Sequence, residues 1–155
     1  MASVKDNELT LASLWLKGQT IYKRSAKAVG LTDNFITVIY TIYRHGEDCS
    51  QKYLVAKTLL PKQTIHFVIG KLEDQGIVVT GQSKKDRRVK VVSLTAKGLD
   101  YAKKVIAPFV KDSQEALASM SSEEQTTLLH LLGRYIEALQ AAINKNVLKG
   151  DPFKH

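Results

Sequence analysis

Residues 84–88 are the part of the sequence whose order is hardest to explain as an ordinary solvated surface. They read Lys-Lys-Asp-Arg-Arg, so a single acid lies inside a run of four cations. In an extended hairpin Asp86 and Arg88 would point to the same side. The carboxylate would then hold the guanidinium in a two-point pair and fix its direction. A charge run around a turn explains the lysines, but it does not explain the acid.

The positive charge of the chain is concentrated around this run. The 155 residues carry a net charge of +8. Between residues 52 and 104 there are twelve basic residues and four acids, whereas the rest of the chain has eleven of each. A chain that is neutral outside one basic segment indicates a polyanionic partner, most simply nucleic acid. A solvated charged face is the alternative.

The residues before the run predict two short helices joined by a tight turn. Ser50 begins the first helix. Pro61 fits the first turn of the second, because the N–H that it lacks would have no helical partner there. Gly76 ends the second helix. Two such helices form a helix-turn-helix.

After Gly76 the periodicity changes from that of a helix to that of a strand. Residues 77–80 and 89–92 are rich in β-branched residues, and the segment between them, GQSKKDRR, consists largely of turn-forming and basic residues. The pattern predicts a β-hairpin with a basic tip, here called the wing, over residues 81–90.

The second helix of the motif, residues 61–75, has an inner and an outer side. Ile65, Ile69 and Leu72 recur at helical spacing and are expected to face inward. A helix of this size fits the major groove of DNA, where Gln and Lys read base edges and an apolar ring meets the thymine methyl. The alternative is that Phe67 packs against its neighbours and His66 is a solvated surface residue. The residues predicted to contact DNA are Lys62, Gln63, Thr64, His66, Phe67 and Lys71.

The wing supplies a second predicted DNA contact. The minor groove is narrow and strongly negative, and it attracts arginine. Arg88 is the predicted inserting side chain, and Asp86 is the residue that positions it. The remaining cations are predicted to meet phosphates: Lys84, Lys85, Arg87 and Lys90.

Helix signals also occur on both sides of this central region. Thr32 and Thr95 are expected to cap helices. Pro108 is expected to kink or interrupt the helix that follows Thr95. Ser121 and Glu124 have the spacing of a capping box. The chain is therefore predicted to contain about six helices.

The first predicted helix, residues 7–27, and the last, which runs to about residue 147, carry long apolar stripes. The middle of the chain is too small to cover both stripes fully, so we expect a second copy of the chain to share them. A self-contained core is the alternative. The stripe residues are Leu11, Leu14, Gly18, Ile21, Tyr22 and Ser25 in the first helix, and Leu128, Leu132, Ile136 (or Tyr135), Leu139, Ile143 and Val147 in the last.

The middle of the chain resembles the MarR family of bacterial winged-helix transcriptional regulators. The resemblance is carried by SQKYLVAKTLLPKQTIHFVIGKLEDQGIV, residues 50–78, and by DRRVKVVSLTAKG, residues 86–98. It implies a mostly α-helical fold with a small β-hairpin wing and a single domain over residues 1–155. Within that domain it implies a winged helix-turn-helix lobe over residues 32–94 and dimerisation helices over residues 7–29 and 95–148.

The resemblance also implies how the protein would bind DNA. It implies a homodimer whose recognition helices enter successive major grooves about 34 Å apart on a near-palindromic operator. It assigns the minor-groove role to Arg88 and the bracing role to Asp86.

Members of this family often respond to a small phenolic or other anionic ligand, a metal or an oxidant. The usual crevice lies between the dimer helices and the winged lobe, where aromatic residues would meet a small anionic or aromatic effector. Four aromatics at helical spacing are also typical of an ordinary core. The candidate pocket residues are Trp15, Tyr22, Tyr40 and Tyr43.

Neither a cofactor nor a metal is expected. Cys49 is the only cysteine. At a helix N-terminus the dipole would favour its thiolate, which is the form an oxidant attacks, but a lone cysteine is usually inert. His45 lies near Cys49 in sequence, but the other histidines are far along the chain, so the residues form no compact ligand cluster.

These observations favour a homodimeric DNA-binding repressor that a small-molecule effector releases. An effector-independent architectural nucleic-acid-binding protein is the alternative. An enzyme is not expected, because the sequence has no paired carboxylates, no nucleophile with a base and no phosphate-binding glycine loop. There is no run of about 18 apolar residues to cross a membrane and no signal peptide. With a single cysteine, these features lead us to expect a cytoplasmic protein.

Overall fold

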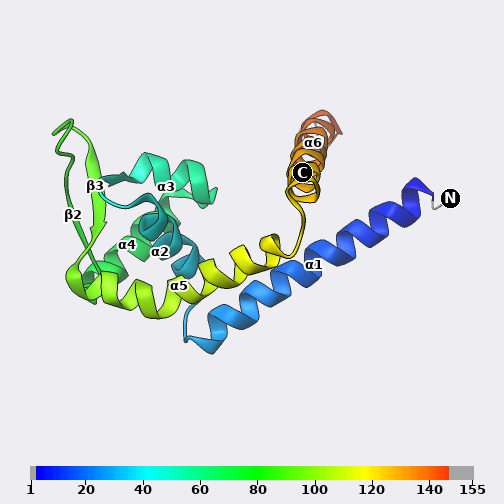
Figure 1. Cartoon of the computed structure of the whole chain (residues 1–155). Coiled ribbons are helices and arrows are strands. Elements are labelled where there is room, and N and C mark those ends of the chain that lie inside the picture. The colour runs from blue at the N-terminus through cyan, green and yellow to red at the C-terminus, as the bar shows by residue number, and fades with distance from the viewer. Residues whose placement is uncertain (1–2, 147–155) are drawn as a thin grey trace. The chain divides into compact units, whose positions relative to one another are not determined.

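The computed structural model describes residues 3–146, which form six helices and three short strands (Figure 1). The winged helix fold class predicted from the sequence is confirmed. The elements are α1 (Val4–Ala28), α2 (Asp33–His45), β1 (Cys49–Ser50), α3 (Gln51–Thr58), α4 (Lys62–Asp74), β2 (Val78–Gln82), β3 (Lys90–Leu94), α5 (Ala96–Ala118) and α6 (Ser122–Asn146).

The chain divides into two compact units, Met1–Phe109 and Val110–His155. The boundary falls inside α5, one residue after Pro108. Helix α5 nevertheless continues through Pro108, so the expected alternative of an interruption is wrong. A proline removes one backbone donor, and the turns on either side keep their own hydrogen bonds.

The three strands form one antiparallel sheet in the order β1-β3-β2. The predicted hairpin pairs Val78 with Leu94 and Gln82 with Lys90. Strand β1, which adds the pair between Cys49 and Val92, was not predicted. Two residues are too few to show an alternating pattern, so this strand left no signal in the sequence.

The core of the first unit lies between α2, α3, α4 and the sheet. The predicted inner side of α4 is confirmed, because Ile65, Ile69 and Leu72 are all buried. Other fully buried side chains come from each surrounding element, namely Ile39 and Ile42 of α2, Leu54 of α3 and Val92 of β3. Burial of this kind, at about 25 cal/mol per Å² of apolar surface, fixes the pose of α4 relative to the wing.

Several helix starts occur where the sequence predicted them. The Ser50 hydroxyl accepts a hydrogen bond from the Tyr53 N–H at 3.1 Å, and that of Thr95 accepts one from the Gly98 N–H at 2.9 Å. Ser121 and Glu124 form both bonds of a capping box. Pro61 is the N-cap of α4 instead of lying in its first turn, and the Thr32 side chain makes no capping bond.

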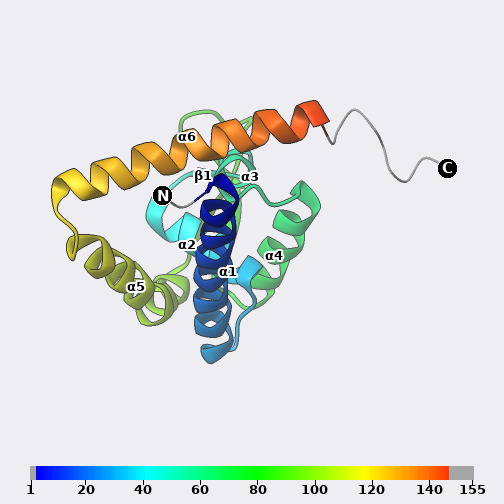
Figure 2. The same ribbon diagram turned by 90° about the vertical axis from the view of Figure 1, so that its right-hand side faces the viewer.

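The end helices α1 and α6 each form an unbroken rod (Figure 2). Helix α1 exposes the predicted stripe residues Leu14, Ile21 and Tyr22. In α6 every residue from 122 to 145 except Gln125 is exposed, including the predicted stripe. The stripe residue Val147 lies outside the described residues. No helix of the described part of the chain is long and apolar enough to cross a membrane.

Candidate nucleic-acid interface

The outer side of α4 presents the six residues predicted to contact DNA. All are exposed except Thr64, which is half-buried. Phe67 is 60% exposed, so it does not lie in the core of this chain. The buried side chains on the inner face of α4 fix the helix in the lobe. The outer side is therefore a rigid surface. The six residues are Lys62, Gln63, Thr64, His66, Phe67 and Lys71.

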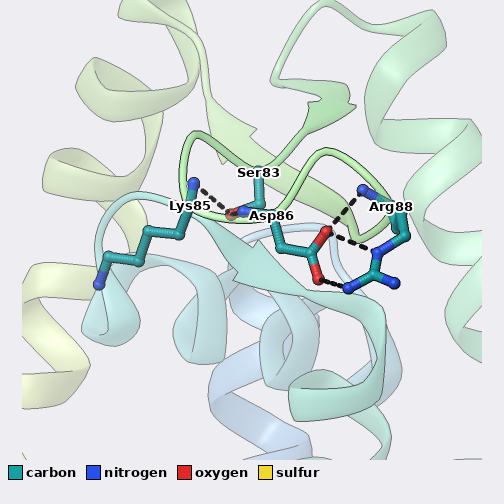
Figure 3. A network of polar contacts seen from close by, with 4 residues as sticks. All are labelled: Ser83, Lys85, Asp86 and Arg88. Atoms are coloured by element: carbon teal, nitrogen blue, oxygen red, sulfur yellow. Dashed lines mark hydrogen bonds and ion pairs between the residues drawn. The ribbon is translucent and has the colours of Figure 1, made fainter.

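At the wing tip Asp86 and Arg88 form the predicted two-point pair (Figure 3). The Asp86 Oδ1 atom accepts hydrogen bonds from the Arg88 backbone N–H at 3.0 Å and from Nε at 3.1 Å. The Oδ2 atom accepts one from Nη2 at 3.2 Å. The guanidinium is therefore held at one edge while its side chain stays open to the surroundings.

The reason for the pairing differs from the one expected. Residues 86–88 lie in a turn, closed by a 2.9 Å hydrogen bond from the Val89 N–H to the Asp86 carbonyl, and not in a strand. The alternation of side chains along a strand therefore does not apply. Asp86 instead accepts the N–H two residues ahead, as aspartate commonly does in turns, and this brings its carboxylate to Arg88.

The hydrogen bonds from Arg88 also change the pKa of the Asp86 carboxyl group. The side-chain bonds first, and the backbone bond second, lower the pKa of Asp86 below its ordinary value of 3.8. The carboxylate is therefore ionised at neutral pH and remains a partner for the guanidinium.

The remaining wing cations are exposed. Lys84 is 3.1 Å from the Glu47 carboxylate, but both side chains are open to solvent, and such surface pairs are weak. The pair does not prevent Lys84 from meeting a phosphate. The other cations that extend from the wing are Lys85, Arg87 and Lys90.

A cleft of about 510 Å³ lies between α3, the start of α4 and the base of the wing. Its walls include Val55 and Ile65, and three lysines converge on it, Lys52, Lys62 and Lys90. Sequence reasoning missed Lys52 as a candidate contact. The available signal was its place in the first turn of α3, directly after the capping Ser50.

The four aromatic residues proposed for an effector pocket lie on α1 and α2. Trp15, Tyr22 and Tyr40 are exposed, and Tyr43 is half-buried. They line neither the cleft beside the wing nor a smaller one formed by Lys23, Thr32, Asp33 and Asn34. A single chain therefore neither buries these aromatics in its core nor gathers them in either cleft.

The structure favours an inert Cys49 over a reactive one. Its side chain is completely buried, and this burial raises the pKa of the thiol to about 11. Desolvation outweighs the helix dipole, because removing a thiolate from water opposes ionisation more strongly than a nearby helix N-terminus favours it. Within residues 3–146 there is also no group of three or more His, Cys, Asp or Glu side chains that could hold a metal ion.

The arrangement of these elements defines a class of protein. Helices α3 and α4 form a helix-turn-helix, and β2 and β3 form a wing beside it that carries a positioned arginine and further cations. This is the winged helix-turn-helix fold of DNA-binding proteins.

Comparison with known proteins identifies the family within this class. The model of the MarR family matches residues 29–89. The chain is 30% identical over 109 residues to the helix-turn-helix transcriptional regulator YkoM of Bacillus subtilis, covering 70% of each protein. It is 22% identical over 148 residues to the transcriptional repressor MdtR of the same organism, covering 96% of this chain and 95% of MdtR.

A solved structure gives the same result. The MarR family regulator NMB1585 from Neisseria meningitidis is 28% identical, with a TM-score of 0.70, and the match covers 88% of this chain and 98% of that one. The chain belongs to the MarR family of transcriptional regulators, which are DNA-binding proteins and not enzymes.

Proposed function

We propose that this protein is a homodimeric repressor that binds a near-palindromic operator, with α4 in the major groove and the wing in the flanking minor groove. The observation that carries the proposal is the pair between Asp86 and Arg88 at the wing tip. A guanidinium held by a carboxylate on one edge keeps its remaining donors free, and a narrow minor groove attracts such a cation. The role as a repressor is supported by the similarity to MdtR along nearly the whole chain.

The proposed homodimer is supported by the exposed stripes of α1 and α6. Monomeric proteins rarely expose apolar patches larger than a few hundred Å². A two-fold dimer would also present two copies of α4, which is the symmetry that a near-palindromic site requires. Since the proposed partner is DNA, we place the activity in the cytoplasm.

We further propose that a small anionic or aromatic effector releases the repressor by binding near α1 and α2. The candidate residues remain Trp15, Tyr22, Tyr40 and Tyr43, whose rings are available for stacking in a site that a dimer would complete. Trp15 is the only tryptophan in the chain. Its fluorescence would therefore report the binding of an added aromatic carboxylate, and a Trp15→Phe variant would give the background signal.

The first test is the binding of the protein to a labelled duplex from upstream of its own gene. Fluorescence anisotropy would compare this duplex with a scrambled duplex of equal length at two salt concentrations. A preference of about a thousandfold or more is expected for a specific regulator. Equal affinity for both, with a steep loss as salt rises, would mean that charge alone drives binding. That outcome would favour an effector-independent architectural protein, unless a site selected from random duplexes restores the preference.

A further inference from the structure

We propose that Asp48 and Ser83 are positioning residues that hold the wing tip in the pose from which Arg88 enters the minor groove. The inference rests on the proposed function and extends it to residues that do not themselves reach the DNA. Asp48 lies in the connection between α2 and β1, whereas Ser83 is the residue directly after β2. The wing tip is therefore tied to a segment that precedes it by 35 residues.

The exposed pair between Asp86 and Arg88 does not by itself fix the direction of the arginine. The side chains of Arg88 and Asp86 are 91% and 44% exposed, and ion pairs in such surroundings contribute little. Because Asp86 and Arg88 are only two residues apart, the ion pair also changes direction whenever the backbone of that turn does. The pose of Arg88 therefore depends on what holds residues 83–86.

Ser83 holds that backbone. It is a buried polar residue, with 8% of its surface exposed. Its hydroxyl oxygen accepts hydrogen bonds from the N–H groups of Lys85, at 3.1 Å, and Asp86, at 3.4 Å (Figure 3). Two consecutive peptide groups directly before the Asp86 side chain are thus bound to one buried atom.

Asp48 fixes Ser83 in turn. Its Oδ2 atom accepts hydrogen bonds from the Ser83 hydroxyl and from the Lys84 N–H, both at 3.2 Å. The backbone of Asp48 has φ = 58°, a left-handed conformation that L-residues rarely adopt but that aspartate tolerates. Such a conformation persists where the surrounding bonds determine it, and here the bonds direct the carboxylate into the wing.

The bonds form a continuous series from the lobe to the proposed DNA contact. Asp48 binds Ser83, Ser83 binds the peptide groups of residues 85 and 86, and Asp86 binds Arg88. Glu47, the residue next to Asp48, does not belong to this series, because its carboxylate pairs with the exposed ammonium of Lys84 and not with the backbone of the wing. Glu47 therefore provides a matched control that carries the same charge at nearly the same place.

The test compares Asp48→Ala with Glu47→Ala on a duplex that binds the wild-type protein specifically and has A·T-rich flanks. Each substitution removes one negative charge near the DNA, so Coulomb's law alone predicts slightly tighter binding in both. We expect Glu47→Ala to stay within about twofold of the wild type or to bind more tightly. We expect Arg88→Ala to lower the affinity about tenfold. Asp48→Ala should lower it at least roughly threefold but not beyond the loss caused by Arg88→Ala.

A double-substitution cycle separates positioning from general damage. If Asp48 acts through Arg88, adding Asp48→Ala to Arg88→Ala should weaken binding no further. Ser83→Ala should reproduce the weaker binding with no change of charge. Asp48→Asn should restore part of it, because a single amide oxygen can accept both bonds, although without the charge of the carboxylate.

Hydrogen exchange of the free protein gives a readout that does not involve DNA. In Asp48→Ala and Ser83→Ala the amides of residues 84–88 should exchange faster, while those of the buried part of α3 keep their wild-type rates. Binding by Asp48→Ala and Ser83→Ala as tight as wild type, while Arg88→Ala weakens it, would overturn the inference and leave the proposed function intact. If the wild-type protein selects no duplex, or Arg88→Ala binds normally, the proposed function fails first.

Discussion

The winged lobe and the end helices use similar apolar residues with opposite results. In the lobe, α2, α3, α4 and the sheet bury their apolar sides against one another, so that Ile42 and Leu54 have no exposed surface. In α1 and α6 the stripes stay open, so that Leu14 is 61% exposed and Leu132 38%. The lobe therefore has a complete core of its own, whereas α1 and α6 each carry apolar surface that the unit to which the helix belongs leaves uncovered.

The contrast shows that helical periodicity predicts which side of a helix is apolar but not what covers that side. Helix α4 and helix α6 both show an apolar stripe at helical spacing. For α4 the covering surface comes from the neighbouring elements of the chain. For α6 we propose that it comes from a second copy. Substitutions in the lobe should therefore change the stability of the single chain, whereas substitutions in the stripe of α6 should change its association.

The largest effect is expected from charges placed on the stripe of α6. The double substitution Leu132→Glu with Leu139→Glu would desolvate carboxylates in the proposed dimer interface, at several kcal/mol for each. We expect the dissociation constant of the dimer to rise by more than about a thousandfold. Sedimentation equilibrium would measure this change as the appearance of monomer.

The matched control carries the same charges on the opposite side of α6. Residues 127 and 141 lie on that side according to the 3.6-residue repeat, so Thr127→Glu with Ala141→Glu should leave the dimer intact. Dissociation of both variants alike would point to net charge as the cause. A wild-type protein that is already monomeric at all concentrations would remove the proposed interface altogether.

A large loss of stability is also expected from a substitution at Gly98, where α5 begins beside the winged lobe. A Cβ atom there would overlap the backbone carbonyl of Ile77, which a change of rotamer cannot relieve. We expect Gly98→Ala to lower the free energy of unfolding by about 3 kcal/mol, at the upper end of overpacking effects. Urea unfolding followed by circular dichroism would measure it.

Gly70 provides the control for this substitution within the same lobe. It lies inside α4, and an added Cβ would meet no atom within 4 Å. Gly70→Ala should therefore raise helix stability by up to about 1 kcal/mol. A loss of stability in both variants would contradict the close approach of α5 to the residue before β2.

A pair of leucine truncations compares the two regions directly. Leu54→Ala opens a cavity in the lobe and should lower stability by about 2–5 kcal/mol. Leu132→Ala should lower it less, because its side chain is partly exposed in the single chain. The melting temperature would be measured at two protein concentrations for each variant.

The dependence on concentration distinguishes the two substitutions. Loss at Leu132 should act through association, so the difference between its melting temperature and that of the wild type should shrink once dilution has dissociated both proteins into monomers. The difference caused by Leu54→Ala should persist at every concentration, because it arises within the single chain. If dilution affected Leu54→Ala and Leu132→Ala equally, the two regions would not differ in the way proposed here.

The sequence was sufficient to predict features determined by neighbours within a few residues. The inner side of α4, the caps at Ser50 and Thr95 and the pairing of Asp86 with Arg88 all depend on spacings of two to four residues. Local chemistry favours these contacts wherever the segment lies in the fold. Their presence in the structure is therefore the expected consequence of short-range patterns.

The features that were missed depend on residues far apart in the chain. The bond between Asp48 and Ser83 joins two loops, and no pattern of either loop indicates the other. The burial of Cys49 follows from its pairing with Val92, which adds a strand too short to be recognised. The stripes of α1 and α6 were recognised, but what covers them is not encoded in periodicity.

The smallest expected effect concerns Cys49 and tests how closed the lobe is. Burial raises the pKa of its thiol from 9.0 to about 11, so at pH 8 its thiolate population should be about a hundredfold below that of an open thiol. Alkylation by iodoacetamide should slow at least in proportion, and peroxide should not change DNA binding. A cysteine introduced by Thr127→Cys, on the exposed side of α6, should react like a free thiol in a Cys49→Ala background.

The same shift gives a direction for stability against pH. Because the pKa of Cys49 in the folded chain lies above its ordinary value of 9.0, the folded state retains the proton that the unfolded state loses first. The contribution is complete below pH 9 and disappears as the pH rises towards about 11. Urea unfolding of the wild type and of Cys49→Ala between these pH values would measure it. If the free energy of unfolding changed with pH in the same way for both proteins, the thiol would be open to water even though its side chain lies in the core.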